Sequence, residues 1–139
     1  MKYLHSGYIL FCQNAEHGDE GRLDLNGLID VFALEELPVD MKCACVIGFG
    51  TPFERRQYKG FVHIVDPTGR EVLTREFSAN NPDDVYKGHY VFNPEMKLDK
   101  EGAWTVKVLL KNWKNENMWD FERKFWCMKH SNLDGPPDP

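Results

Sequence analysis

The sequence lacks a long apolar segment. A helix that spans a membrane needs about 20 consecutive apolar residues, and no run in these 139 residues approaches that length. The apolar stretch Gly7–Cys12 follows Lys2, but it is too short for an export signal, so we interpret it as a strand. We therefore expect a cytoplasmic protein without a membrane partner.

An excess of positive charge is also missing. Acidic residues outnumber basic residues by 22 to 17, which gives a formal net charge of −5. The field of such a chain repels phosphate backbones, so we expect no nucleic-acid partner. Low-complexity tracts are absent and aromatic residues make up 13% of the chain, a composition typical of a packed core. We expect one domain over residues 1–133 and a flexible, Pro-rich tail over residues 134–139.

Catalytic and cofactor-binding motifs are missing too. The chain has no Gly-x-Ser-x-Gly elbow, no phosphate-binding glycine loop and no His-Glu-x-x-His motif. A structural zinc site needs four converging ligands, and only Cys43 and Cys45 come close to ligand spacing. His63 and His89 could meet across a sheet, although a hydrogen-bonded, half-buried histidine is the more common outcome. We predict a non-enzymatic protein with no cofactor and no metal.

Acidic residues gather in the segment Glu16–Glu20. Together with Asp24, or with Asp83 and Asp84, this segment resembles a calcium-binding edge. A regular Asp-x-Asp-x-Asp-Gly loop is missing, however, and turns favour the same residue types. We interpret the segment as a solvated turn. The four cysteines, which we expect to be reduced, buried thiols, are Cys12, Cys43, Cys45 and Cys127.

Alternation of apolar and polar residues with period two predicts strands. It is clearest at Ala103–Asn112, and Met118–Met128 is the predicted hairpin partner of that strand. A second hairpin is predicted over residues 59–77, because the turn Asp66-Pro-Thr-Gly69 places proline and glycine where a turn needs them. Further strands are predicted at residues 7–14, 22–27, 41–49 and 86–93.

A sustained helical repeat is missing, and only Leu28–Leu37 could hold a helical turn. Strands about every ten residues without intervening helices predict an all-β, two-sheet antiparallel β-sandwich of about seven to eight strands. We expect Asn26-Gly27 to break or bulge its strand, and Phe32–Pro38 to carry the chain to the other sheet. The strand Met41–Phe49 is apolar on both faces, and pairing with another chain would shield it if it lay at an edge.

Several turn and core positions form a recognisable series. They are Cys12, Gly21-Arg-Leu-Asp-Leu-Asn-Gly27, Leu37-Pro38, the Gly60, His63, Asp66 and Gly69 hairpin, and Gly102-Ala-Trp-Thr-Val106. From Tyr8 to Phe125 the chain resembles a family of uncharacterised bacterial sandwich domains. The resemblance implies an immunoglobulin-like sandwich and no established activity. The charged segment Glu16–Glu20 is longer than that pattern leads us to expect.

The aromatic residues indicate a binding surface. In the last predicted strand one face is apolar and the other is mixed, and Trp126 and Met128 fall on the mixed face. If exposed, they would form a patch suited to a partner or to sugar rings. Coverage of both faces is the alternative, because large aromatic side chains are usually well buried. The candidate binding residues are Trp113, Trp119, Trp126 and Met128.

The leading hypothesis is a non-enzymatic β-sandwich module that acts through protein–protein interaction or self-association. The alternative is a carbohydrate or small-ligand binding domain that uses Trp113, Trp119 or Trp126 as a stacking platform. Fold analogy by itself does not assign a function.

Overall fold

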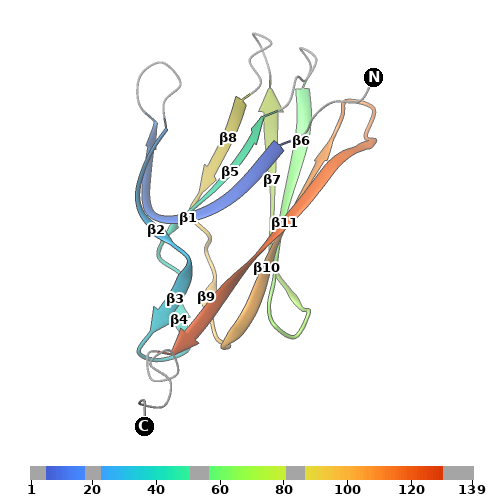
Figure 1. Cartoon of the computed structure of the whole chain (residues 1–139). Helices are drawn as coiled ribbons and strands as arrows, with labels where there is room; N and C mark the ends of the chain where they lie inside the picture. Colours follow the sequence, from blue (N-terminus) through green and yellow to red (C-terminus); the bar gives the residue numbers. More distant parts are fainter. Residues whose placement is uncertain (1–5, 18–22, 51–56, 81–86, 130–139) are drawn as a thin grey trace.

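The computed structural model describes residues 6–17, 23–50, 57–80 and 87–129. These residues form strands and no helix, so the protein is all-β, as predicted (Figure 1). Helices able to cross a membrane are likewise absent from these ranges. The strands are β1 (Ser6–His17), β2 (Leu23–Ile29), β3 (Val31–Leu34), β4 (Val39–Asp40), β5 (Ala44–Gly50), β6 (Gln57–Val65), β7 (Glu71–Asn80), β8 (Lys87–Phe92), β9 (Lys97–Leu98), β10 (Gly102–Lys111) and β11 (Asn117–Lys129).

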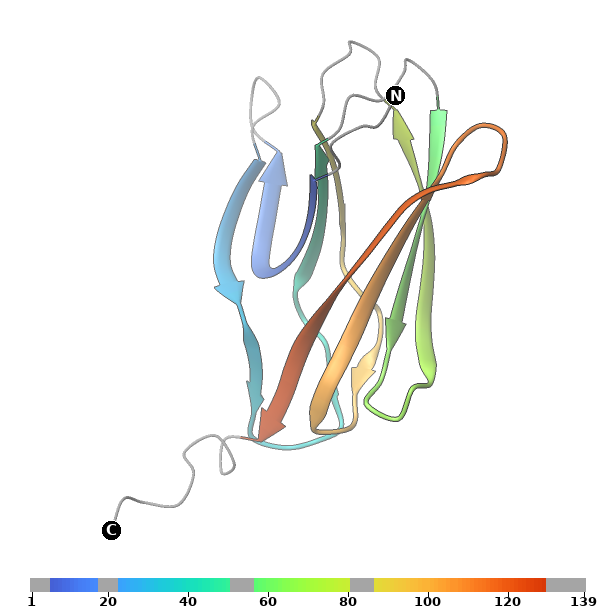
Figure 2. The ribbon, with the colours of Figure 1, turned by 45° about the vertical axis from the view of Figure 1, so that its right-hand side comes forward.

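The strands form two larger sheets and one short ladder. The first sheet has the order β2-β1-β5-β8, the second has the order β3-β11-β10-β6-β7, and β4 pairs with β9. In Figure 2, β1, β2 and β5 stand on the left, and β6, β7, β10 and β11 stand on the right. We predicted purely antiparallel pairing, but β3 runs parallel to β11. The described residues also contain more strands than predicted, because β3, β4 and β9 are too short to show a period.

Both predicted hairpins are present. Strands β10 and β11 pair from Gly102 opposite Cys127 onward, and β6 pairs with β7 across a turn in which the Gly69 N–H donates to the Asp66 carbonyl at 3.0 Å. The alternation in β10 also has the predicted consequence. The inward side chains, each at most 1% exposed, are Trp104, Val106, Val108 and Leu110.

Side chains of the two larger sheets meet in one core. Phe11 of β1 lies 5.5 Å from Phe32 of β3 and 4.8 Å from Phe125 of β11, measured between ring centroids. Burying a side chain of this size stabilises the fold by about 1.5–3 kcal/mol. This aromatic cluster therefore ties the first strands of the chain to its last strand.

The chain changes sheets earlier than predicted. Strand β2 belongs to the first sheet and β3 to the second, so a first crossing occurs at Asp30, and the chain after Leu34 then crosses back to β5 of the first sheet. The helical turn suggested for Leu28–Leu37 is wrong, because Phe32 pairs with Cys127 and is buried in the core, which keeps this segment extended. Gly27 has a φ of 68°, yet β2 keeps its register to β1 on both sides of it, so the strand is neither broken nor bulged.

Strand β5 lies inside its sheet, between β1 and β8, and is not an edge strand. Its two apolar faces pack in different hydrophobic clusters. Cys45 and Ile47 enter the main core, whereas Ala44 and Val46 pack with Cys12 in a second cluster. Strand β1 is strongly curved (Figure 2). A strand that is buried on both faces needs apolar side chains on both. This explains why the residues of Met41–Phe49 are apolar on both faces.

Some predictions fall on residues outside the described ranges. They concern the tail over residues 134–139, most of the acidic segment Glu16–Glu20, and Asp83 and Asp84.

Candidate functional site

The outer face of the five-stranded sheet carries polar side-chain pairs over β6 and β7. Lys59 Nζ lies 3.8 Å from Glu76 Oε1, and His63 Nδ1 lies 2.8 Å from Glu71 Oε1. The Thr74 hydroxyl also donates to Glu71, and this bond, followed by the one to His63, lowers the pKa of the Glu71 carboxyl. These neighbouring strands therefore present a solvated, polar surface.

The same face carries apolar side chains where the end of β11 lies beside β3. Trp126 is 51% exposed and lies in register with Val31 of β3, which is 39% exposed, and with the small side chain of Ala103 of β10. Half-buried Met128 lies opposite Ala33. We call these five residues the Trp126 patch. The predicted mixed face of the last strand is confirmed, and Trp126 on it is exposed.

Trp113 lies elsewhere, in the turn between β10 and β11. It is 41% exposed, and its ring meets that of Tyr58 edge to face at 5.9 Å. It borders a pocket of about 440 Å³ with Lys59, Asn112 and Asn115.

The predicted tryptophans do not form one platform. Trp113 precedes β11 and Trp126 lies near the end of that strand. At about 3.3 Å per residue, the two are roughly 30 Å apart along β11. The backbone of Trp119 pairs with Leu110, but its side chain lies outside the described part of the structure.

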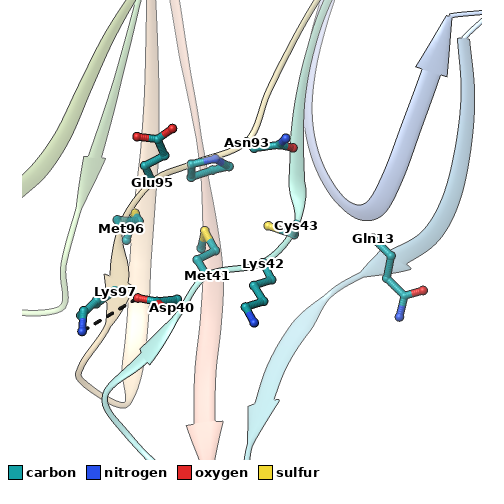
Figure 3. Close-up of a pocket in the computed structure, with 10 residues that line it drawn as sticks. Gln13, Asp40, Met41, Lys42, Cys43, Asn93, Glu95, Met96 and Lys97 are labelled. Atoms are coloured by element: carbon teal, nitrogen blue, oxygen red, sulfur yellow. Dashed lines mark ion pairs between the residues drawn. The ribbon is translucent and has the colours of Figure 1, made fainter.

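A larger pocket, of about 670 Å³, opens beside the short β4–β9 ladder (Figure 3). The ladder continues by one residue pair beyond Asp40 and Lys97, since the Met41 N–H donates to the Met96 carbonyl at 3.0 Å. Asp40 and Lys97 form an exposed ion pair of 3.9 Å at this pocket. The buried and half-buried lining residues are Met41, Cys43, Pro94 and Met96, and the exposed ones are Gln13, Asp40, Lys42, Asn93, Glu95 and Lys97.

The four cysteines are free and buried, as predicted. Burial raises the pKa of the Cys43 thiol to about 12 and that of Cys127 to about 11, and it also raises the pKa values of Cys12 and Cys45. Because the thiolate is the reactive form, none of these thiols is primed as a nucleophile at neutral pH.

Within the described ranges, no three His, Cys, Asp or Glu side chains are grouped so that they could hold a metal ion. The suggested meeting of His63 and His89 across a sheet is wrong, because β6 and β8 belong to different sheets. Sequence reasoning missed the pocket beside β4 and β9, because a two-residue strand has too few positions to show a period.

The family model described as a family of unknown function (DUF6941) matches residues 7–118 of the chain. The chain matches no curated protein and no solved structure.

Proposed function

We propose a function for this chain, which belongs to DUF6941, a family of unknown function. It is a non-enzymatic module that self-associates through the Trp126 patch. The observation that carries the proposal is the exposure of Trp126 beside Val31, on a sheet face that carries polar side-chain pairs over β6 and β7. Tryptophan is enriched among the residues that contribute most binding energy in protein interfaces. Removing this ring from water is favourable, because burial of apolar surface yields about 25 cal/mol per Å².

The position of β3 supports a protein partner. It is the last strand of its sheet, so one side of its backbone has no neighbouring strand within the described residues. A strand added there would lie directly beside Val31 and close to Trp126. Edge pairing and burial of the patch would therefore occur in one interface.

The proposal includes an immunoglobulin-like sandwich. Strands β5 and β8 are neighbours in one sheet, and β11, β10, β6 and β7 follow one another in the second. This order corresponds to strands B and E and to strands G, F, C and C′ of an immunoglobulin variable domain. Strand β1 departs from that pattern, because it lies between β2 and β5.

We further propose a bacterial protein that works in the cytoplasm. The bacterial part rests on the resemblance of its turn and core positions alone. Four buried free thiols support a reducing compartment, since cytosolic proteins keep cysteines reduced. The raised thiol pKa values support the non-enzymatic part of the proposal.

Light scattering coupled to size-exclusion chromatography tests self-association. We expect the mass of the full chain to rise with concentration, and Trp126→Ser to weaken association by at least about tenfold, which corresponds to 1.4 kcal/mol. The matched control is Trp113→Ser, which removes another exposed tryptophan outside the patch. A wild-type protein that stays monomeric at high concentration, or equal effects of the two substitutions, would contradict the proposal.

A second candidate function is carbohydrate binding at Trp113. The observation that favours it is a partly exposed tryptophan that shares one pocket with the amide side chain of Asn115. Such a ring can stack on a sugar while amides bind its hydroxyls. Calorimetric titration with a panel of oligosaccharides tests it, and we expect binding heat that Trp113→Ala removes. Absence of heat across the panel would leave this candidate without support.

A further inference from the structure

The register of the β4–β9 ladder brings two methionines face to face. Val39 pairs with Leu98 and Asp40 with Lys97, and the hydrogen bond from Met41 N–H to the Met96 carbonyl extends this register by one pair. Residues directly opposite each other in an antiparallel ladder have Cβ atoms about 5 Å apart on the same face. Both side chains border the pocket of about 670 Å³, so two flexible thioethers share one cavity.

The Cys43 thiol borders the same cavity, because Cys43 lies two residues after Met41 and on the same side of the chain. Met41 and Cys43 are each 6% exposed, whereas Lys42 between them is exposed, so burial alternates along this segment. Figure 3 shows Lys42 directed away from the Met41 and Cys43 side chains. Cys43 also borders the pocket, and in the described part of the chain its thiol has no hydrogen-bond partner.

We propose that Cys43, Met41 and Met96 form a binding site for a single monovalent copper ion, Cu(I). Thiolate and thioether sulfur atoms are the soft ligands that Cu(I) prefers. The site is built from three positions that the fold places around one cavity.

The charge of the ligand set selects a monovalent ion. One thiolate and two neutral thioethers carry a total charge of −1, so bound Cu(I) leaves the cluster neutral. A divalent ion would leave a net positive charge among side chains that are mostly buried, which is costly. The acidic side chains that border the pocket, Asp40 and Glu95, are both exposed, and Asp40 is paired with Lys97. The buried and half-buried side chains of the lining therefore offer one thiol and two thioethers, which supply neither the four Cys or His ligands of a structural zinc site nor the oxygen ligands of a calcium site.

Binding at this site involves no electron transfer. Copper enters and remains as Cu(I), a bond forms between copper and Cys43 Sγ, and the thiol proton passes to solvent. The two methionine sulfur atoms add lone pairs without losing a proton. The three side chains border a pocket that is already present, so the strands need not separate to admit the ion.

The test is an anaerobic titration of the full chain with Cu(I) in competition with a chromophoric chelator. We expect one Cu(I) per chain. Cys43→Ala should abolish this binding, and Met41→Leu and Met96→Leu should each weaken it by at least about tenfold. Leucine and methionine have similar volumes, so these two variants are expected to remain folded, which circular dichroism checks.

The matched controls are Cys127→Ala and Met118→Leu, which remove another buried thiol and another half-buried thioether away from the pocket. Both should bind Cu(I) like the wild type. X-ray absorption of the loaded protein should show sulfur ligands only. The proposal is overturned if the wild type binds no Cu(I), if the Cys43→Ala or methionine variants bind it unchanged, or if Cys127→Ala removes binding equally.

Discussion

At the scale of single residues, Asp66 is a charged side chain that is 3% exposed, and among the described residues no other polar or charged residue is buried. Its Oδ1 accepts hydrogen bonds from the Thr68 hydroxyl at 2.6 Å, the Thr68 N–H at 2.8 Å and the Arg70 N–H at 3.1 Å. Its buried Oδ2 lies 3.2 Å from Lys100 Nζ, in an ion pair without hydrogen-bond alignment. The Thr68 hydroxyl and these further donors hold the pKa of Asp66 well below its usual range, against the opposing effect of burial.

Replacing this charge should destabilise the fold. We expect Asp66→Asn to lower the free energy of unfolding by about 2 kcal/mol, since the amide puts a neutral group where a charged acceptor is buried. Urea unfolding followed by tryptophan fluorescence measures this. The control is Asp99→Asn, which removes the other carboxylate beside Lys100 but is 44% exposed at its side chain. Its effect should be well under 1 kcal/mol, and equal effects would contradict a special role for Asp66.

The lowered pKa also predicts loss of stability in acid. Because the pKa of Asp66 is lower in the folded than in the unfolded chain, its contribution is complete above about pH 4, the ordinary pKa of an aspartate. The contribution declines as the pH falls from there toward the folded-state pKa. Thermal unfolding between pH 7 and pH 3 should show this decline in the wild type and a shallower one in Asp66→Asn. Parallel pH profiles would rule out the assignment.

Sequence reasoning reached only part of this residue network. The Asp66-Pro-Thr-Gly69 turn follows from local composition, because proline and glycine favour it wherever it occurs. The ion pair with Lys100 joins residues from different elements. No local pattern encodes such a contact, so only the fold could reveal it.

At the scale of elements, a glycine in strand β6 leaves room for an aromatic ring of its paired neighbour β7. Gly60 is opposite Phe77, and a Cβ at Gly60 would come within 2.1 Å of the Phe77 ring. That ring is 6% exposed and stacks on Tyr90 with centroids 4.3 Å apart. Gly60 is thus needed for a close approach and not for an unusual backbone angle.

The space around two glycines predicts different costs for the same substitution. Gly60→Ala should lower the free energy of unfolding by about 1–3 kcal/mol, because the stacked Phe77 cannot move away. Gly48→Ala creates an equally close contact, but with Tyr8, which is 39% exposed and has room to shift outward. Its cost should be smaller. Denaturant unfolding of both variants measures the difference, and equal costs would contradict this account.

Elements with a local signal were predicted well. The hairpins β6–β7 and β10–β11 combine alternation with a nearby turn, so neighbouring residues specify them. The short strands β3, β4 and β9 lack that signal. Strand β3 forms because Phe32 is buried against Phe11 and Phe125 from distant parts of the chain, which a window of local sequence cannot contain.

At the scale of the whole molecule, net charge opposes the proposed self-association and exposed apolar surface favours it. Each chain carries a formal net charge of −5, so two copies repel each other at long range. The Trp126 patch supplies a short-range attraction that does not depend on charge. The proposed association therefore has a defined dependence on salt.

Raising the salt concentration from about 0.05 M to about 0.5 M should leave self-association unchanged or strengthen it, because salt screens the repulsion between chains and not the apolar contact. Sedimentation equilibrium at the two concentrations measures the dissociation constant. Trp126→Ser should lose association at both. A steep weakening by salt would show that ion pairs, and not the patch, hold the copies together.

The sequence alone determined that the protein is all-β, which segments form its main hairpins, and which faces of β10 and β11 point inward. These properties depend on the alternation of neighbouring side chains and on turn residues. Only the tertiary structure decided that β5 lies inside its sheet, that β3 runs parallel to β11 beside Trp126, and that Met41, Cys43 and Met96 share one cavity. These arrangements arise from pairing between residues far apart in the chain, where burial of the joint core selects one register among many.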